Sequence, residues 1–249
     1  PTTKTKEIQP PTQKSVDTVP PSTQSGEEPM GDGISMFYDP DPTPAPTSEA
    51  QRLIDALRYK DWLPSRGQVL LVSIRGIAPL GTNSFDDRAG TVYRDHQGEL
   101  HVKLYDATND PGDHWLNNPM KAGGTAVACP GYYTGAMMLG DHKGKPGLLN
   151  RGLTPITYNR YLSDGEGGWK INESNSTNFI GLNIHRAGTA STQVDRWSAG
   201  CTVFARAADM DEVLHTCKGA LDFCKGGTLY FSYAILEHNE VHGTYSYLS

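Results

Sequence analysis

A cysteine and a histidine sixteen residues apart have the types and spacing for nucleophilic chemistry. Cys201 lies in a turn of small residues that begins at Trp197, and His185 ends the apolar run before that turn. A cysteine attacks a carbonyl carbon as the thiolate and therefore needs a neighbouring base. A histidine after one strand and a cysteine on the next turn can meet across a cleft. The spacing favours a nucleophile–base pair, and the alternative is a hydrogen-bonded strand-end histidine with a small buried cysteine.

The other cysteines have patterns typical of structural residues. Cys217 and Cys224 share the apolar face of a predicted helix, about 10 Å apart by helical rise, which is beyond disulfide reach. Cys129 ends a predicted strand. Because no CxxC or paired Cys/His spacing occurs, we expect no metal and no cofactor. Cys201 differs, since the amides of its turn could face an anion and the start of the following helix would lower the pKa of its thiol.

Composition divides the chain near residue 48. Ten of the 17 prolines fall in the first 50 residues, where three lysines stand against eight acidic residues and account for most of the net charge of −6. We therefore predict a disordered or extended Pro/Thr-rich linker or docking strap over 1–47 and one folded domain over 48–249. The acidic balance argues against a nucleic-acid partner, and no apolar run is long enough for a membrane span.

The domain is predicted to be mainly β, with one or two short helices. Ser48 followed by Gln51 indicates the start of a helix, and a second apolar face recurs with helical spacing after residue 206. A histidine-containing segment near 238–242 differs from a zinc helix because its glutamate is one place late, and it is predicted to continue the last strand. The expected helices are 49–60 and 207–225, and the expected strands are 68–77, 90–94, 100–105, 124–128, 131–139, 155–161, 179–185 and 228–236.

The order His185, then Ser198-Ala199-Gly200-Cys201, resembles the catalytic motif of L,D-transpeptidase (YkuD-like) domains. That family carries a histidine, about 14–18 residues, and then Ser/Thr-His-Gly-Cys. The resemblance implies a β-sandwich or barrel-like domain with Cys201 as nucleophile and His185 as base. It also implies that the backbone carbonyl of Arg186 orients the imidazole and that the amides of Ala199 and Gly200 stabilise the oxyanion.

One position departs from the family pattern. The family's second histidine, directly before Gly-Cys, is Ala199 here, so substrate polarisation or specificity could differ. What the resemblance implies is a cysteine peptidase or L,D-transpeptidase-like acyl transferase that acts on a peptidoglycan stem peptide through a thioester. Hydrolysis and transpeptidation both remain open.

A second resemblance covers about residues 106–217. The motifs Asn183–Gly188 and Asp195–Cys201 are similar to those of uncharacterised phage and prophage proteins with a WSAGC motif. It implies a particle-associated or exported protein whose N-terminal segment could bind particle proteins. The expected substrate contacts, which include a histidine position common in those relatives, are Trp197, Arg196, Ser198, His142 and Tyr133.

Two other functional classes stay open. A non-catalytic structural or wall-binding component of a phage-like particle would need neither a reactive thiol nor a base. An effector that attacks a host protein with the same dyad would need both. The relative placement of His185 and Cys201 separates the catalytic classes from the structural one.

Overall fold

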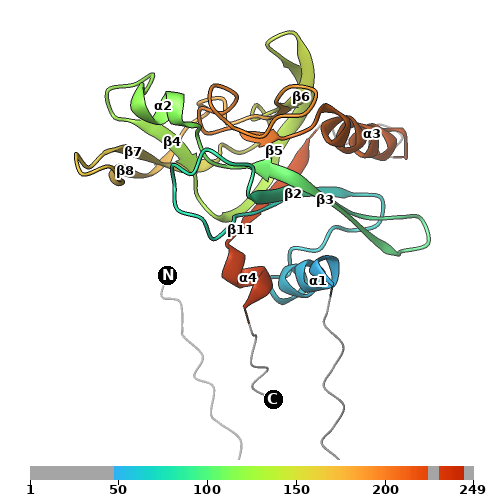
Figure 1. Cartoon of the computed structure of the whole chain (residues 1–249). Coiled ribbons are helices and arrows are strands. Elements are labelled where there is room, and N and C mark those ends of the chain that lie inside the picture. The colour runs from blue at the N-terminus through green and yellow to red at the C-terminus, as the bar shows by residue number, and fades with distance from the viewer. Residues whose placement is uncertain (1–47, 224–229, 244–249) are drawn as a thin grey trace, which may run out of the picture. The chain divides into compact units, whose positions relative to one another are not determined.

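The computed structural model describes residues 48–223 and 230–243, with only the backbone of 222 and 223. Within these ranges, eight strands close into a barrel and a three-stranded sheet extends from its side (Figure 1). The predicted segment 1–47, together with Cys224, lies outside the described residues. In barrel order the strands are β1 (Val69–Ile74), β11 (Phe231–Leu236), β5 (Gly131–His142), β6 (Lys145–Leu149), β9 (Ile184–Arg186), β10 (Thr202–Phe204), β3 (Leu100–Thr108) and β2 (Asp87–Arg94).

The side sheet has the strand order β4-β7-β8, and both of its pairings are antiparallel. Figure 1 shows it beside the barrel, near the short helix α2. The prediction of a mainly β fold with few short helices is confirmed. The described part contains four helices, two of which have only five residues. The bounds are β4 (Thr125–Ala128), β7 (Thr157–Ser163), β8 (Trp169–Thr177), α1 (Glu49–Tyr59), α2 (Asp113–Asn117), α3 (Ala207–Phe223) and α4 (His238–His242).

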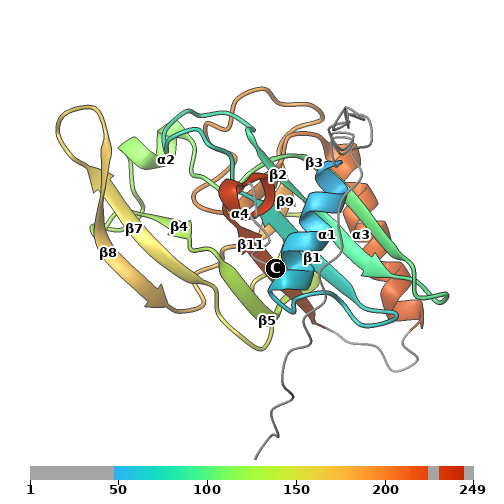
Figure 2. The ribbon, with the colours of Figure 1, turned by 90° about the horizontal axis from the view of Figure 1, so that it is seen from below.

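Strand alternation divides the apolar residues into two cores. Leu71 of β1 belongs to the cluster inside the barrel, against which Met210 of α3 packs. Leu70 belongs to a second cluster on the outer face, together with Leu57 of α1 and Val241 of α4. Figure 2 shows α1 and α4 over this face of the barrel. The barrel is therefore covered by helices on one outer face and filled by side chains within.

A polar network crosses the barrel interior. The Tyr233 hydroxyl lies 2.6 Å from Ser73 Oγ and 2.7 Å from Thr202 Oγ1. Thr202 Oγ1 donates to Asn109 Oδ1 at 2.9 Å. These buried bonds connect β1, β11 and β10, and so fix the start of β10 beneath the turn that precedes it.

Several sequence-based boundaries require correction. The segment 238–242 is the helix α4 and not a continued strand, because Glu237 and Glu240 form a reciprocal cap at its start. The predicted strand 179–185 is reduced to Ile184–Arg186. Lys145–Leu149 is a strand that the sequence does not predict. None of the helices in the described ranges is long and apolar enough to cross a membrane.

Candidate active site

A cavity of about 490 Å³ contains both residues of the predicted dyad in its lining. A second cavity of about 270 Å³ adjoins it and shares the lining residues His142, Lys143, His185, Arg196 and Trp197. Cys201 and Ala199 line the larger cavity but not the smaller one, whereas Arg186 lines the smaller cavity but not the larger one. The structure therefore brings together most of the site residues predicted from the sequence.

Two parallel strands position the histidine and the cysteine. The register of β9 and β10 places His185 opposite Val203, and Cys201 precedes Val203 by two residues. Because strand side chains alternate, His185 and Cys201 lie on the same side of the pair. Thr202, which lies between Cys201 and Val203 in the chain, points to the opposite side and joins the interior network. The two potential reactants consequently share one face and one cavity.

The turn before Cys201 needs a residue without a side chain. Gly200 has φ +110°, and a Cβ there would lie 2.2 Å from the Ala126 carbonyl oxygen. Ser198 is fully buried and closes the turn, since its hydroxyl donates to the Cys201 carbonyl at 2.8 Å. The Gly200 amide donates to Ser198 Oγ at 3.1 Å. To serve as an oxyanion donor, that amide would have to release this bond.

His185 has a defined orientation. Its Nδ1 lies 3.0 Å from the Arg186 carbonyl oxygen, which can only accept a hydrogen bond. Nδ1 therefore carries the proton of the neutral ring, and the lone pair is on Nε2. Burial lowers the pKa of His185 to about 4, the Arg186 carbonyl opposes this shift, and His142 and Lys143 add to it. At neutral pH the ring is uncharged and able to accept a proton.

A second histidine, His142, stacks on His185. The ring centroids are 4.4 Å apart and the planes differ by 20°. Asn183 Nδ2 donates to His142 Nδ1 at 3.0 Å, so neutral His142 carries its proton on Nε2. Burial and the nearby Lys143 lower the pKa of His142. The stack covers one face of the His185 ring and so helps to fix the plane of that ring.

The Cys201 thiol is in an environment that disfavours its charge. Burial raises its pKa, against the smaller effects of the Asn183 amide and Lys143, and its Sγ lies 3.5 Å from the Gly181 carbonyl oxygen. The expected lowering by a helix start does not occur, because β10 separates Cys201 from α3. Cys201 and His185 therefore rest as a neutral thiol and a neutral imidazole.

The predicted substrate contacts divide into two groups. Trp197 is 41% exposed and lines both cavities, as do Arg196 and His142. Ser198 is buried in the turn. Tyr133 is also buried, and its hydroxyl donates to the Cys129 carbonyl at 2.7 Å, so the structure does not bring it to either cavity.

Sequence reasoning missed two parts of the site. The sequence predicts a strand over 179–185, but Phe179 and Ile180 lie outside the observed strand, are 52% and 37% exposed and line the larger cavity. Arg160, from β7, and Lys121 complete that wall. The sequence gives no sign that these four residues share a site, because they come from separate segments that only the fold brings together.

Potential metal ligands lie elsewhere. In the described part of the chain, Asp95, Glu99 and His101 form the one group of three with ligand atoms within 4.8 Å, on the β2–β3 hairpin. Asp95 Oδ2 and His101 Nε2 already pair at 2.7 Å. His238 and His242 stack one helical turn apart on α4. Neither set borders the cavities.

No family model, curated protein or solved structure matches this chain.

Proposed function

We propose that the protein is a cysteine-dependent acyl transferase that acts on peptidoglycan stem peptides, as a peptidase or an L,D-transpeptidase. The observation that carries this proposal is the placement of Cys201 and His185 on one cavity, with the His185 lone pair on Nε2. The substrate class rests on the motif that resembles L,D-transpeptidases. The association with a phage-like particle rests on the second resemblance and forms part of the same proposal.

The reaction follows from the protonation states. His185 Nε2 takes the Cys201 proton as the sulfur attacks a peptide carbonyl carbon, and a tetrahedral oxyanion forms. The C–N bond then breaks, and the leaving amine takes the proton from His185. Water or the amine of a second stem attacks the thioester and gives a proton to His185. The C–S bond then breaks, and the leaving sulfur takes that proton from His185, which restores the neutral thiol and imidazole. Because the resting pair is neutral, deprotonation accompanies attack and does not precede it.

Digestion of purified sacculi tests the proposal. Native protein, Cys201→Ala and Cys129→Ala are incubated with sacculi, and stem peptides are identified by mass spectrometry. Cys129 is a matched control, since it is a partly buried thiol that lines neither cavity. We expect release or exchange of stem peptides by native protein and Cys129→Ala only. Identical products from native protein and Cys201→Ala would overturn the nucleophile assignment.

A non-catalytic structural or wall-binding role is the second candidate. Two observations favour it: the raised pKa of the Cys201 thiol and the internal use of the Gly200 amide. The dependence of alkylation on His185 separates the two roles. A catalytic pair predicts that His185→Gln slows iodoacetamide labelling of Cys201. A structural role predicts that labelling is equally slow in both proteins, while binding to sacculi persists in Cys201→Ala.

A further inference from the structure

The hairpin of β5 and β6 places lysines beside the dyad. Its two-residue turn consists of Lys143 and Gly144, with φ values of 51° and 78°. These angles are typical of the tight turns that join antiparallel strands. The register pairs His142 with Lys145, directly before and after the turn. Since His142 stacks on His185, the hairpin tip holds both lysines at the wall of the smaller cavity.

Two arginines line the same cavity. Arg186 follows His185 at the end of β9, and Arg196 belongs to the segment that leads to the Cys201 turn. Trp197 provides an exposed aromatic wall. The cavity of about 270 Å³ is thus lined by four cationic side chains, two histidines and a tryptophan.

These cations lack acidic partners in the described part of the chain. None of Lys143, Lys145, Arg186 and Arg196 takes part in the ion pairs found there. Neither cavity is lined by a described acidic residue. The two acidic residues nearest to these cations in the sequence are hydrogen-bonded elsewhere. Asp141 accepts a hydrogen bond from the Gly144 amide, and Asp195 accepts one from the Asn83 side chain. Like charges that converge on a small cavity without counter-charges favour an anionic ligand.

We propose that the smaller cavity is an anion subsite that holds a carboxylate of the peptide substrate while a nearby carbonyl meets Cys201. This inference rests on the proposed function for the identity of the peptide. The two cavities share residues around His185, so a ligand can occupy both at once. Arginine pairs well with carboxylates through two parallel hydrogen bonds, and a cavity of this size fits one such group with its adjoining atoms.

Binding to an inactive protein tests the subsite separately from catalysis. Cys201→Ala is titrated by calorimetry with a stem tetrapeptide and with two versions of it, one amidated at the C-terminal carboxylate and one at the side-chain carboxylate of the third residue. We expect one amidation to weaken binding by roughly fivefold or more, and that amidation identifies the carboxylate concerned. Higher salt should reduce the difference.

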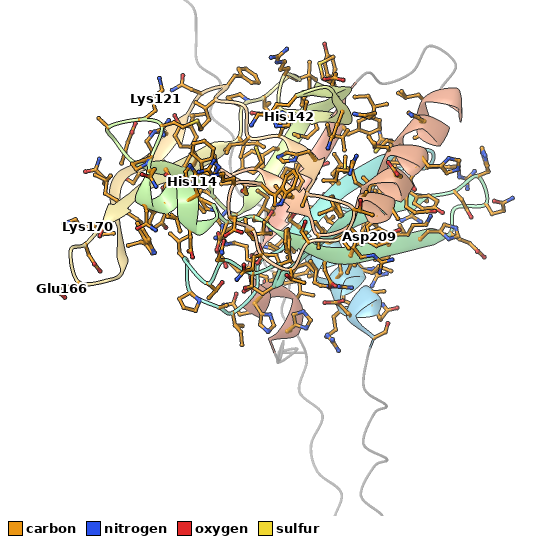
Figure 3. The ribbon with its side chains drawn as sticks, turned by 45° about the horizontal axis from the view of Figure 1, so that its top comes forward. His114, Lys121, His142, Glu166, Lys170 and Asp209 are labelled. Atoms are coloured by element: carbon orange, nitrogen blue, oxygen red, sulfur yellow. The ribbon has the colours of Figure 1, made fainter. Side chains whose placement is uncertain are left out.

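Charge variants locate the effect. Lys143→Gln with Lys145→Gln, and separately Arg196→Gln, should weaken binding of the free acid and remove the difference from the amide. Lys170→Gln is the control, because Lys170 lies on β8 and Figure 3 shows it far from His142. Equal binding of acid and amides, no binding of any peptide, or equal effects of the cavity and control variants would overturn the inference. Carboxylate-dependent binding without turnover by native protein would support the subsite and contradict only the proposed catalysis.

Discussion

At the scale of single residues, His185 combines burial with a directed hydrogen bond. The Arg186 carbonyl fixes which nitrogen carries the proton, and burial keeps the ring neutral at physiological pH. The hydrogen bond leaves a free lone pair on Nε2, while burial weakens the ring as a base and makes its protonation costly to the fold. The stability of the protein should therefore report the titration of this residue, whatever its function.

We predict that His185→Gln reduces the loss of stability on acidification. The folded-state pKa of His185 is about 4, below its unfolded value, so the unfolded chain binds the additional proton between these values. The contribution of the neutral His185 ring to the free energy of unfolding is complete above the unfolded-state pKa of about 6.5. It falls by up to about 3 kcal/mol as the pH decreases to about 4. Urea unfolding across this window measures it. Parallel curves for native protein and variant would show that His185 does not titrate with a depressed pKa.

A second residue-scale prediction concerns the interior network. Thr202→Val removes the hydroxyl that bonds to Asn109 Oδ1 and to the Tyr233 hydroxyl, while the bonds of Tyr233 to Ser73 and Asn109 stay, and the two lost buried bonds should cost about 1–3 kcal/mol. Thr91→Val is the matched control, because the Thr91 hydroxyl is buried and has no hydrogen-bond partner. That substitution should be neutral or stabilising. Chemical denaturation compares the two, and equal losses would mean that the network contributes nothing specific.

At the scale of elements, the turn before Cys201 is the least replaceable part of the site. Gly200 combines a positive φ with close contact to the Ala126 carbonyl, whereas Gly165 has φ +86° and open space around it. We predict that Gly165→Ala costs about 1 kcal/mol from backbone strain alone. Gly200→Ala should add about 1–3 kcal/mol of steric strain. Thermal unfolding measures both, and similar losses would indicate that the turn can move aside.

The sequence predicted elements whose signals are local. Ser48 accepts from the Gln51 amide at 3.2 Å, as its spacing indicated, and the 90–94 and 100–105 strands pair as a hairpin. It did not predict β8, because nearly all residues of that strand are exposed and no alternation marks it. The error at Phe179 and Ile180 has a different cause. Apolar residues there line a cavity and not a core.

The candidate site, like the fold, was predictable from the sequence only where its residues lie close together in the chain. Cys201 and His185 belong to adjacent segments, so their spacing in the chain reflects the parallel pairing of β9 and β10. Lys143 and Lys145 come from a hairpin about forty residues earlier, and no local pattern connects them with the dyad. Tyr133 was misplaced because strand alternation indicates two faces but does not show which face borders a ligand.

At the scale of the whole molecule, the helical layer on the outer face should contribute strongly to stability. Leu57 of α1 is fully buried in the cluster that joins α1, α4 and the barrel. We predict that Leu57→Ala costs about 2–5 kcal/mol in the free energy of unfolding. Leu153→Ala removes the same atoms from a side chain that is 63% exposed and should cost much less. Equal midpoints of denaturation would show that α1 is not part of the cooperative unit.

The parallel pairing of β1 with β11 has a consequence for biosynthesis. β1 is made early and β11 near the end of the described chain, so a ribosome must translate the Cys201 turn and α3 before the last strand is available. Until then, β1 and β5 each present an unpaired edge, because β11 lies between them in the finished barrel. Such edges can pair with other chains, and closure over this sequence separation is slow. Completion of the barrel is thus a late event, and these two edges stay open to pairing with other chains until β11 is in place.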